Sequence, residues 1–168
     1  MRNRFPVILV ATILSGSLSG YLFVISDQPV WGMTYGPGIY FGLATAALFA
    51  WLYRSPILKL GLWLGASIVS WYLALQLAMA MINVPSGGGI IGYVSGGLLG
   101  SLLLSIFFWL LIRRVNRERI YLTVATGGIL AVVMFLILQG ADAEPTASYM
   151  ISFVIWQVGV GLALTLEA

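Results

Sequence analysis

Two glutamines, each beside aromatic residues in an uncharged stretch, are the side chains best placed to do chemistry in this chain. Gln76 follows Trp71 and Tyr72 by about one helical turn, and Gln157 follows Trp156 directly. An amide surrounded by hydrocarbon needs a hydrogen-bond partner, because an unmet donor or acceptor there is costly. We therefore expect both amides to face the interior of the fold. They either join helices through a hydrogen bond or, with Trp71, Tyr72 and Trp156, line a pocket for a small molecule.

Other kinds of site are excluded by the residues that the chain lacks. It contains no cysteine and no histidine, so disulfides, thiolate chemistry, imidazole ligands and serine–histidine catalysis are ruled out. No Asp, Glu, Lys or Arg lies near the middle of any apolar stretch long enough to cross a membrane. This absence argues against proton relays and voltage sensing, which need charged groups within the membrane. We expect no metal ion and no cofactor, and an enzyme only if the loop acids Asp27, Asp142 and Glu144 act in catalysis. Asp142 and Glu144 could also bind a cation weakly, although a solvated loop is the simpler interpretation.

The composition indicates which elements must position these side chains. Hydrophobic residues make up 61% of the 168 residues and charged residues 8%, whereas soluble domains carry roughly 25% charged residues. No charged residue occurs between Lys59 and Arg113, a stretch long enough for two membrane crossings of ~20 residues each. The other charge-free stretches are 5–26, 28–53, 120–141 and 145–166. A soluble fold is therefore excluded.

The sequence predicts an all-α fold, a polytopic integral membrane protein built as a six-helix transmembrane bundle. We expect one domain, residues 1–168, because no loop is long enough to form a second. The helices are predicted at about 6–25, 37–53, 57–82, 90–112, 120–139 and 148–166.

The basic residues predict the orientation of the bundle. With six spans, all of them fall at one end: Arg2, Arg4, Arg54, Lys59, Arg113, Arg114, Arg117 and Arg119. By the positive-inside rule both termini are then cytoplasmic, in a cytoplasmic-type cell membrane. One alternative is that residues 1–19 are a cleaved signal peptide, because two arginines precede an apolar run that ends in small residues. Five spans would then remain, with the same orientation.

The four arginines after the fourth predicted helix, Arg113, Arg114, Arg117 and Arg119, have two compatible roles. They fix the topology, and they can bind anionic lipid head groups at about 1 kcal/mol per basic residue near the surface. Because the position of the charges beside membrane spans explains the excess of basic residues, we expect the lipid bilayer as a partner and no nucleic acid.

Glycine repeats every four residues in the fourth predicted helix, at Gly88, Gly92, Gly96 and Gly100. Gly16 and Gly20 make a shorter version in the first helix, and the same spacing occurs at Gly38 and Gly42 and at Gly61 and Gly65. Such glycine zippers let helix backbones approach closely. Packing within one chain is the simplest interpretation. The alternatives are self-association and a pore-lining helix that bends at Gly96 and Gly97. The opposite face, with Leu102 and Trp109, is predicted to meet lipid.

These features leave two classes of function. The leading hypothesis is a non-enzymatic membrane protein with a structural role or a role as an assembly subunit, whose partner is a second copy or another membrane protein. The alternative is a carrier or channel for a small neutral or lipophilic solute. That function would use the region of Gln76 and Gln157 and the glycine-rich fourth helix.

Overall fold

Residues 4–25, 34–84, 87–113, 115–140 and 145–165 are described by the computed structural model. The helices are α1 (Phe5–Ile25), α3 (Gly36–Tyr53), α4 (Ile57–Ile82), α5 (Gly88–Phe107), α6 (Arg117–Gln139) and α7 (Pro145–Thr165). A short π-helix, η1 (Phe108–Ile112), continues α5. Arg2, Asp27, Arg114, Asp142 and Glu144, for which the sequence suggested roles, lie outside the described residues.

Within the described ranges, six helices are long and apolar enough to cross a membrane, with η1 counted as the end of α5. The predicted all-α, six-helix membrane bundle is confirmed, and each predicted helix end lies within about one turn of the observed one. Large apolar side chains such as Leu14, Leu58 and Ile129 are exposed on the outer surface, as expected for helices that lie in lipid. The chain is therefore a multi-pass membrane protein.

Local sequence explains several helix ends. The Asn116 side chain accepts a hydrogen bond from the backbone N–H of Arg119 at 3.0 Å and so caps the start of α6. Pro37 lies in the first turn of α3, where its missing N–H costs nothing. Arg54 ends α3 in the left-handed conformation, with φ of 51°, and this tight reversal leads into α4.

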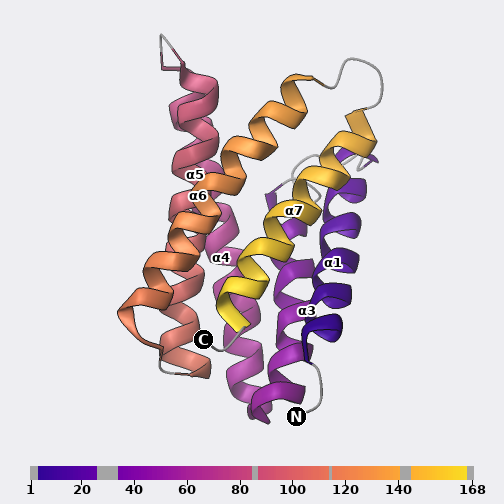
Figure 1. The fold of residues 1–168 in the computed structure, drawn as a ribbon, viewed down its shortest axis with the longest axis vertical. Coiled ribbons are helices and arrows are strands. Elements are labelled where there is room, and N and C mark those ends of the chain that lie inside the picture. The colour runs from indigo at the N-terminus through magenta and orange to yellow at the C-terminus, as the bar shows by residue number, and fades with distance from the viewer. Residues whose placement is uncertain (1–3, 26–33, 85–86, 114, 141–144, 166–168) are drawn as a thin grey trace.

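The helices form a closed ring, in which each contacts the next along the chain and α7 returns to contact α1 (Figure 1). In that view α6 and α7 cross the near face of the bundle at a slant, and α1 lies along one edge. The start of α1 and the end of α7 lie at the same end of the bundle, with the turn from α3 to α4. The side chains that point into the ring decide whether its centre is filled or hollow.

Glycines bring neighbouring helices into backbone contact. A methyl group added at Gly92 would lie 2.7 Å from the carbonyl oxygen of Ala78 in α4, and one added at Gly16 would lie 2.5 Å from the Cα of Val154 in α7. The same holds for Gly20 against α7 and for two further α5 glycines against α4, Gly88 and Gly96, whereas a methyl group added at Gly100 would meet the Ala74 side chain, 3.2 Å from its Cβ. Gly61 and Gly65 differ, since nothing lies within 4 Å of a methyl group added there.

The interior of the ring has two halves along the helix axes. The half at the end where α3 leads into α4 is filled by four aromatic side chains. These residues, Phe49, Tyr53, Trp63 and Phe108, are called the aromatic cluster below. The Phe49 ring centroid lies 5.0 Å from that of Trp63 and 5.1 Å from that of Phe108, and all three side chains are fully buried. Trp63 Nε1 donates a hydrogen bond to Thr45 Oγ1 at 2.8 Å. These buried rings fill the centre of the bundle at this end, which is called the solid half below.

Candidate ligand cavity

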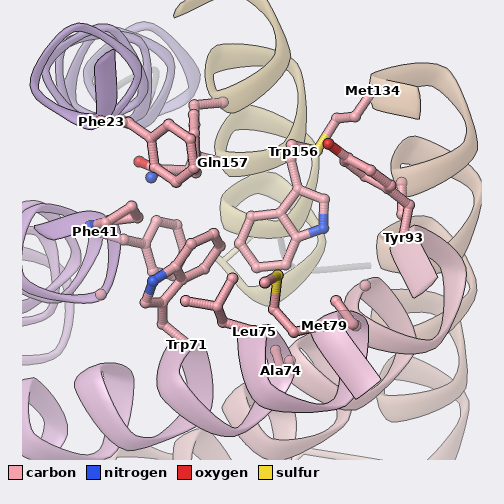
Figure 2. Close-up of a pocket in the computed structure, with 18 of the residues that line it drawn as sticks. Phe23, Phe41, Trp71, Ala74, Leu75, Met79, Tyr93, Met134, Trp156 and Gln157 are labelled. Carbon is pink, nitrogen blue, oxygen red and sulfur yellow. The ribbon is translucent and has the colours of Figure 1, made fainter. Parts of the chain in front are cut away.

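The other half of the ring, where α4 and α6 end and α5 and α7 begin, contains a cavity of about 670 Å³ (Figure 2). Each of the membrane-spanning helices described above contributes to its wall. Phe41, Leu104 and Trp156 line the cavity and also belong to the buried core, so they form its floor on the side of the aromatic cluster. Small-molecule pockets typically measure ~300–1,000 Å³, so the space can hold a drug-sized molecule.

The wall of the cavity is mostly apolar and aromatic. Phe41 packs against Trp156 with ring centroids 6.2 Å apart, and Trp71 packs against Phe153 at 5.4 Å. Figure 2 shows Met79 on the α4 side of the space, pointing toward Trp156. Among the described residues that line it, none is Asp, Glu, Lys or Arg. A charged ligand would lose its hydration there without meeting an opposite charge, so the wall suits a neutral molecule.

Gln157 is almost fully buried and is held by two serines of α1. Ser15 Oγ donates a hydrogen bond to Gln157 Oε1, and Gln157 Nε2 donates to Ser19 Oγ at 2.9 Å. Ser19 Oγ donates in turn to the carbonyl oxygen of Ser15 at 2.8 Å. The amide therefore faces the bundle interior, where it joins α7 to α1 and also lines the cavity.

Gln76 differs from the expectation that both amides face the interior. It lines the cavity, but its side chain is exposed. It lies less than two turns before α4 ends at Ile82, close enough to the end of the helix for its amide to reach water. Met79, one turn further on, also lines the cavity and is 56% exposed. The cavity therefore reaches the protein surface beside these two residues.

The three aromatic residues predicted to accompany the glutamines divide into two groups. Trp71 and Trp156 line the cavity, whereas Tyr72 does not and instead stacks on Tyr35, with centroids 5.9 Å apart and planes at 14°. Tyr72 is the next residue after Trp71, so the helical rotation of ~100° per residue turns it away from the space that Trp71 faces.

Trp156 presents a polar group to the cavity. Its side chain is only 8% exposed, and its indole N–H makes no hydrogen bond with any residue that the structure describes. In Figure 2 the indole nitrogen lies on the edge of the ring turned away from Phe41 and toward the side of Tyr93. Tyr93 and Tyr149 also line the cavity.

Two sets of residues were missed by the sequence reasoning as parts of this site. The partners of Gln157 are Ser15 and Ser19, and their i, i+4 spacing on one face of α1 is a signal that could have found them. Tyr93 and Tyr149 had no such signal, because a tyrosine near a helix end fits an interfacial anchor equally well.

The basic residues that the structure describes lie at the opposite end of the bundle, beside the aromatic cluster. The Arg113 guanidinium lies over the Tyr53 ring, 5.7 Å from its centroid, and Arg117 is exposed while Arg119 is half-buried. Head-group binding by these arginines stays a prediction. Over the described part of the chain, no group of three or more His, Cys, Asp or Glu residues could hold a metal ion.

Comparisons with protein-family models, with curated proteins and with solved structures found no match for this chain. The fold defines a class, a multi-pass membrane protein whose helices enclose a cavity in one half of the ring. Because a fold does not by itself imply a function, the function has to be inferred from the cavity.

Proposed function

We propose that this protein is a carrier that binds a small neutral, lipophilic solute in the cavity. The observation that carries the proposal is a space of about 670 Å³ whose described wall is uncharged and rich in aromatic side chains. A purely structural protein would gain nothing from such a space, because unfilled volume forfeits packing contacts and lowers stability. A ligand that fills the space restores those contacts.

The two ends of the cavity support a carrier rather than a channel. The floor, formed with Phe41, Leu104 and Trp156, rests against the solid half of the bundle, while the cavity reaches the surface beside Gln76 and Met79. A space open at one end and closed at the other is one of the two states that alternating access requires. A channel would need a continuous path past the aromatic cluster.

The proposed orientation puts the basic end of the bundle in the cytoplasm and the cavity in the outer half of the membrane. The described basic residues at that end are Arg4, Arg54, Lys59, Arg113, Arg117 and Arg119. Asn83 and Asn116 are both exposed and lie at opposite ends, and the chain has no cysteine of its own. Asn83→Cys should react with an impermeant thiol reagent on intact cells, and Asn116→Cys should not. The reverse labelling pattern would invert the proposed orientation.

The binding proposal is tested by thermal unfolding of the purified protein in detergent with neutral aromatic alcohols and ketones, each paired with a carboxylate or ammonium analogue. Neutral compounds should raise the unfolding temperature, since a ligand at a hundredfold its Kd adds about 2.7 kcal/mol of stability. The charged analogues should not. The proposal fails if no neutral compound raises the temperature, or if the charged analogues raise it equally.

A pair of variants on one helix assigns the effect to the cavity. Leu75 lines the cavity, and Figure 2 shows its side chain between those of Trp71 and Met79. Leu73 lies two residues earlier and is 42% exposed on the outer face. Leu75→Trp should fill the space and abolish stabilisation by the neutral compounds, whereas Leu73→Trp should leave it intact. Equal loss in both variants would place the binding elsewhere.

A second candidate function is the assembly subunit. It is favoured by Gly61 and Gly65, which have the spacing of a helix-packing pair but face open space in the isolated chain. Native mass measurement separates the two candidates, because a stable partner or oligomer supports assembly and a monomer carrying a small molecule supports the carrier. Gly61→Leu should then dissociate an assembly that uses this face and leave a monomeric carrier unchanged.

A further inference from the structure

The most unusual polar group in the cavity is the indole N–H of Trp156. The side chain is more than nine-tenths buried, it lines the cavity, and its N–H has no hydrogen-bond partner among the described residues. Buried tryptophans usually satisfy this donor, as Trp63 does with Thr45. An unmet donor at this depth in a membrane protein is costly, so Trp156 indicates that something absent from the isolated chain accepts its hydrogen bond.

The chemistry of indole restricts what that partner is. The indole N–H only donates, so the group that meets it must be an acceptor. The hydroxyls of Tyr93 and Tyr149 also line the cavity. Each can donate and accept a hydrogen bond, so they do not restrict the solute to an acceptor or to a donor. Most of the side chains labelled around the indole in Figure 2, including Phe41, Leu75, Met79 and Met134, offer no acceptor or only a weak sulfur one, so few groups of the wall compete with a solute for this donor.

We infer that the solute carries a neutral oxygen acceptor, a carbonyl or an ether, which binds the indole N–H of Trp156 while its apolar body packs against Trp71, Leu75 and Phe153. This inference rests on the proposed function and adds the chemical class of the solute and its orientation. The uncharged wall excludes a carboxylate as the acceptor. The exposed side chains of Gln76 and Met79 put the entry at the surface, so the oxygen end points toward the floor.

The test uses two probes that differ at one atom position: benzophenone, an aromatic ketone, and diphenylmethane, which has a methylene group in place of the carbonyl. Affinities are measured by calorimetry in detergent. The wild type should bind benzophenone about 2–12-fold more tightly, the range that corresponds to one net hydrogen bond. Trp156→Phe should bring that ratio to about one with little change for diphenylmethane. Trp109→Phe, at an exposed position, should keep the wild-type ratio.

The outcomes separate this inference from the proposed function. If both probes bind the wild type equally, or if Trp156→Phe keeps the preference for the ketone, the inference is overturned and the carrier proposal stands. If neither probe binds, the proposed function fails with it.

A measurement on the wild type guards against a variant that does not fold. In protein labelled with ¹⁵N-tryptophan, one of the six indole N–H protons should shift downfield with benzophenone and not with diphenylmethane, and the absence of any such downfield shift would overturn the inference.

Discussion

Trp63 and Trp156 both point into the ring of helices, yet their surroundings are opposite. Trp63 is fully buried in the aromatic cluster, its ring contacts Phe49 and Phe108, and its N–H is bonded to Thr45. Trp156 forms the floor of a cavity, and its N–H has no partner among the described residues. The same residue type therefore closes one half of the bundle and lines an open space in the other.

The difference arises from what α5 contributes to each half. Near Trp63 the continuation of α5 supplies Phe108. Around the cavity α5 supplies Tyr93 and Leu104 and, between them, three glycines, Gly96, Gly97 and Gly100. These glycines let α4 and α6 approach α5 closely, and they also add no side-chain volume to the interior. The residues that hold the ring together thus also leave it hollow on one side.

The largest effect is expected at the contact between α1 and α7, which carries the hydrogen bonds of Gln157. A side chain at Gly16 would meet the α7 backbone, with its Cβ 2.5 Å from Val154 Cα, so the two helices would have to separate. Gly16→Leu should cost about 3 kcal/mol or more, the upper range for overpacking, measured by thermal unfolding in detergent. Gly61→Leu is the control, since its Cβ meets nothing within 4 Å, and it should change stability by less than about 0.5 kcal/mol. Equal shifts would mean that the close contact is not needed.

The aromatic cluster should be the next most sensitive region. Phe108→Ala removes a fully buried ring from the solid half and should cost about 2–3 kcal/mol. That is below the ~3–5 kcal/mol typical of soluble cores, because lipid is as apolar as the core and the transfer term is small. Trp109→Ala, at the adjacent residue that is 41% exposed, should be nearly silent. If Trp109→Ala destabilises the protein as much as Phe108→Ala, then the face of η1 that carries Phe108 is not the one that faces the packed interior.

The two tryptophans themselves sharpen the comparison. Trp63→Phe leaves Thr45 Oγ1 without its donor and should cost about 1–2 kcal/mol of unfolding free energy. Trp156→Phe removes a donor that has no partner among the described residues, which offsets part of the packing lost with the smaller ring, so without ligand it should cost under about 1 kcal/mol. Chemical or thermal unfolding of both variants decides this. Equal losses would show that Trp156 is bonded in the ligand-free protein after all.

The smallest expected effect on the free energy of unfolding is the difference between leucine substitutions at Gln157 and at Gln76. Gln157→Leu breaks the hydrogen bonds with Ser15 and Ser19 and should cost about 0.6–1.7 kcal/mol, between the average and the maximum measured for interhelical hydrogen bonds in membranes. Gln76→Leu at the exposed mouth of the cavity should cost less than about 0.5 kcal/mol. A Gln76→Leu loss as large as that of Gln157→Leu would contradict the placement of Gln76 at the surface.

The membrane spans could be predicted from the sequence because the information is local. A stretch such as the one between Lys59 and Arg113 has no charged residue, and no other fold buries so long an apolar run. The glycine spacing of Gly16 and Gly20 pointed to close helix contact for the same reason. The orientation of the bundle in the membrane stays a prediction.

The cavity could be predicted only in part, because it depends on which side chains meet across the ring. Trp63 and Trp156 look alike in the sequence, and only the packing of α5 against each shows that one is enclosed and the other is not. Gln157 could be assigned to the interior from its depth in the last helix. Gln76 and Tyr72 could not be placed, since one helical step decides whether a residue faces the cavity, a neighbouring ring or the surface.

The most direct test of the contrast between the two halves is xenon binding in crystals of the protein, because empty apolar cavities take up this gas and close-packed interiors do not. We expect xenon density among Trp71, Leu75, Phe153 and Trp156, and none among Phe49, Trp63 and Phe108. Density within the aromatic cluster, or a cavity that has closed and takes up no xenon, would contradict a bundle that is solid in one half and hollow in the other.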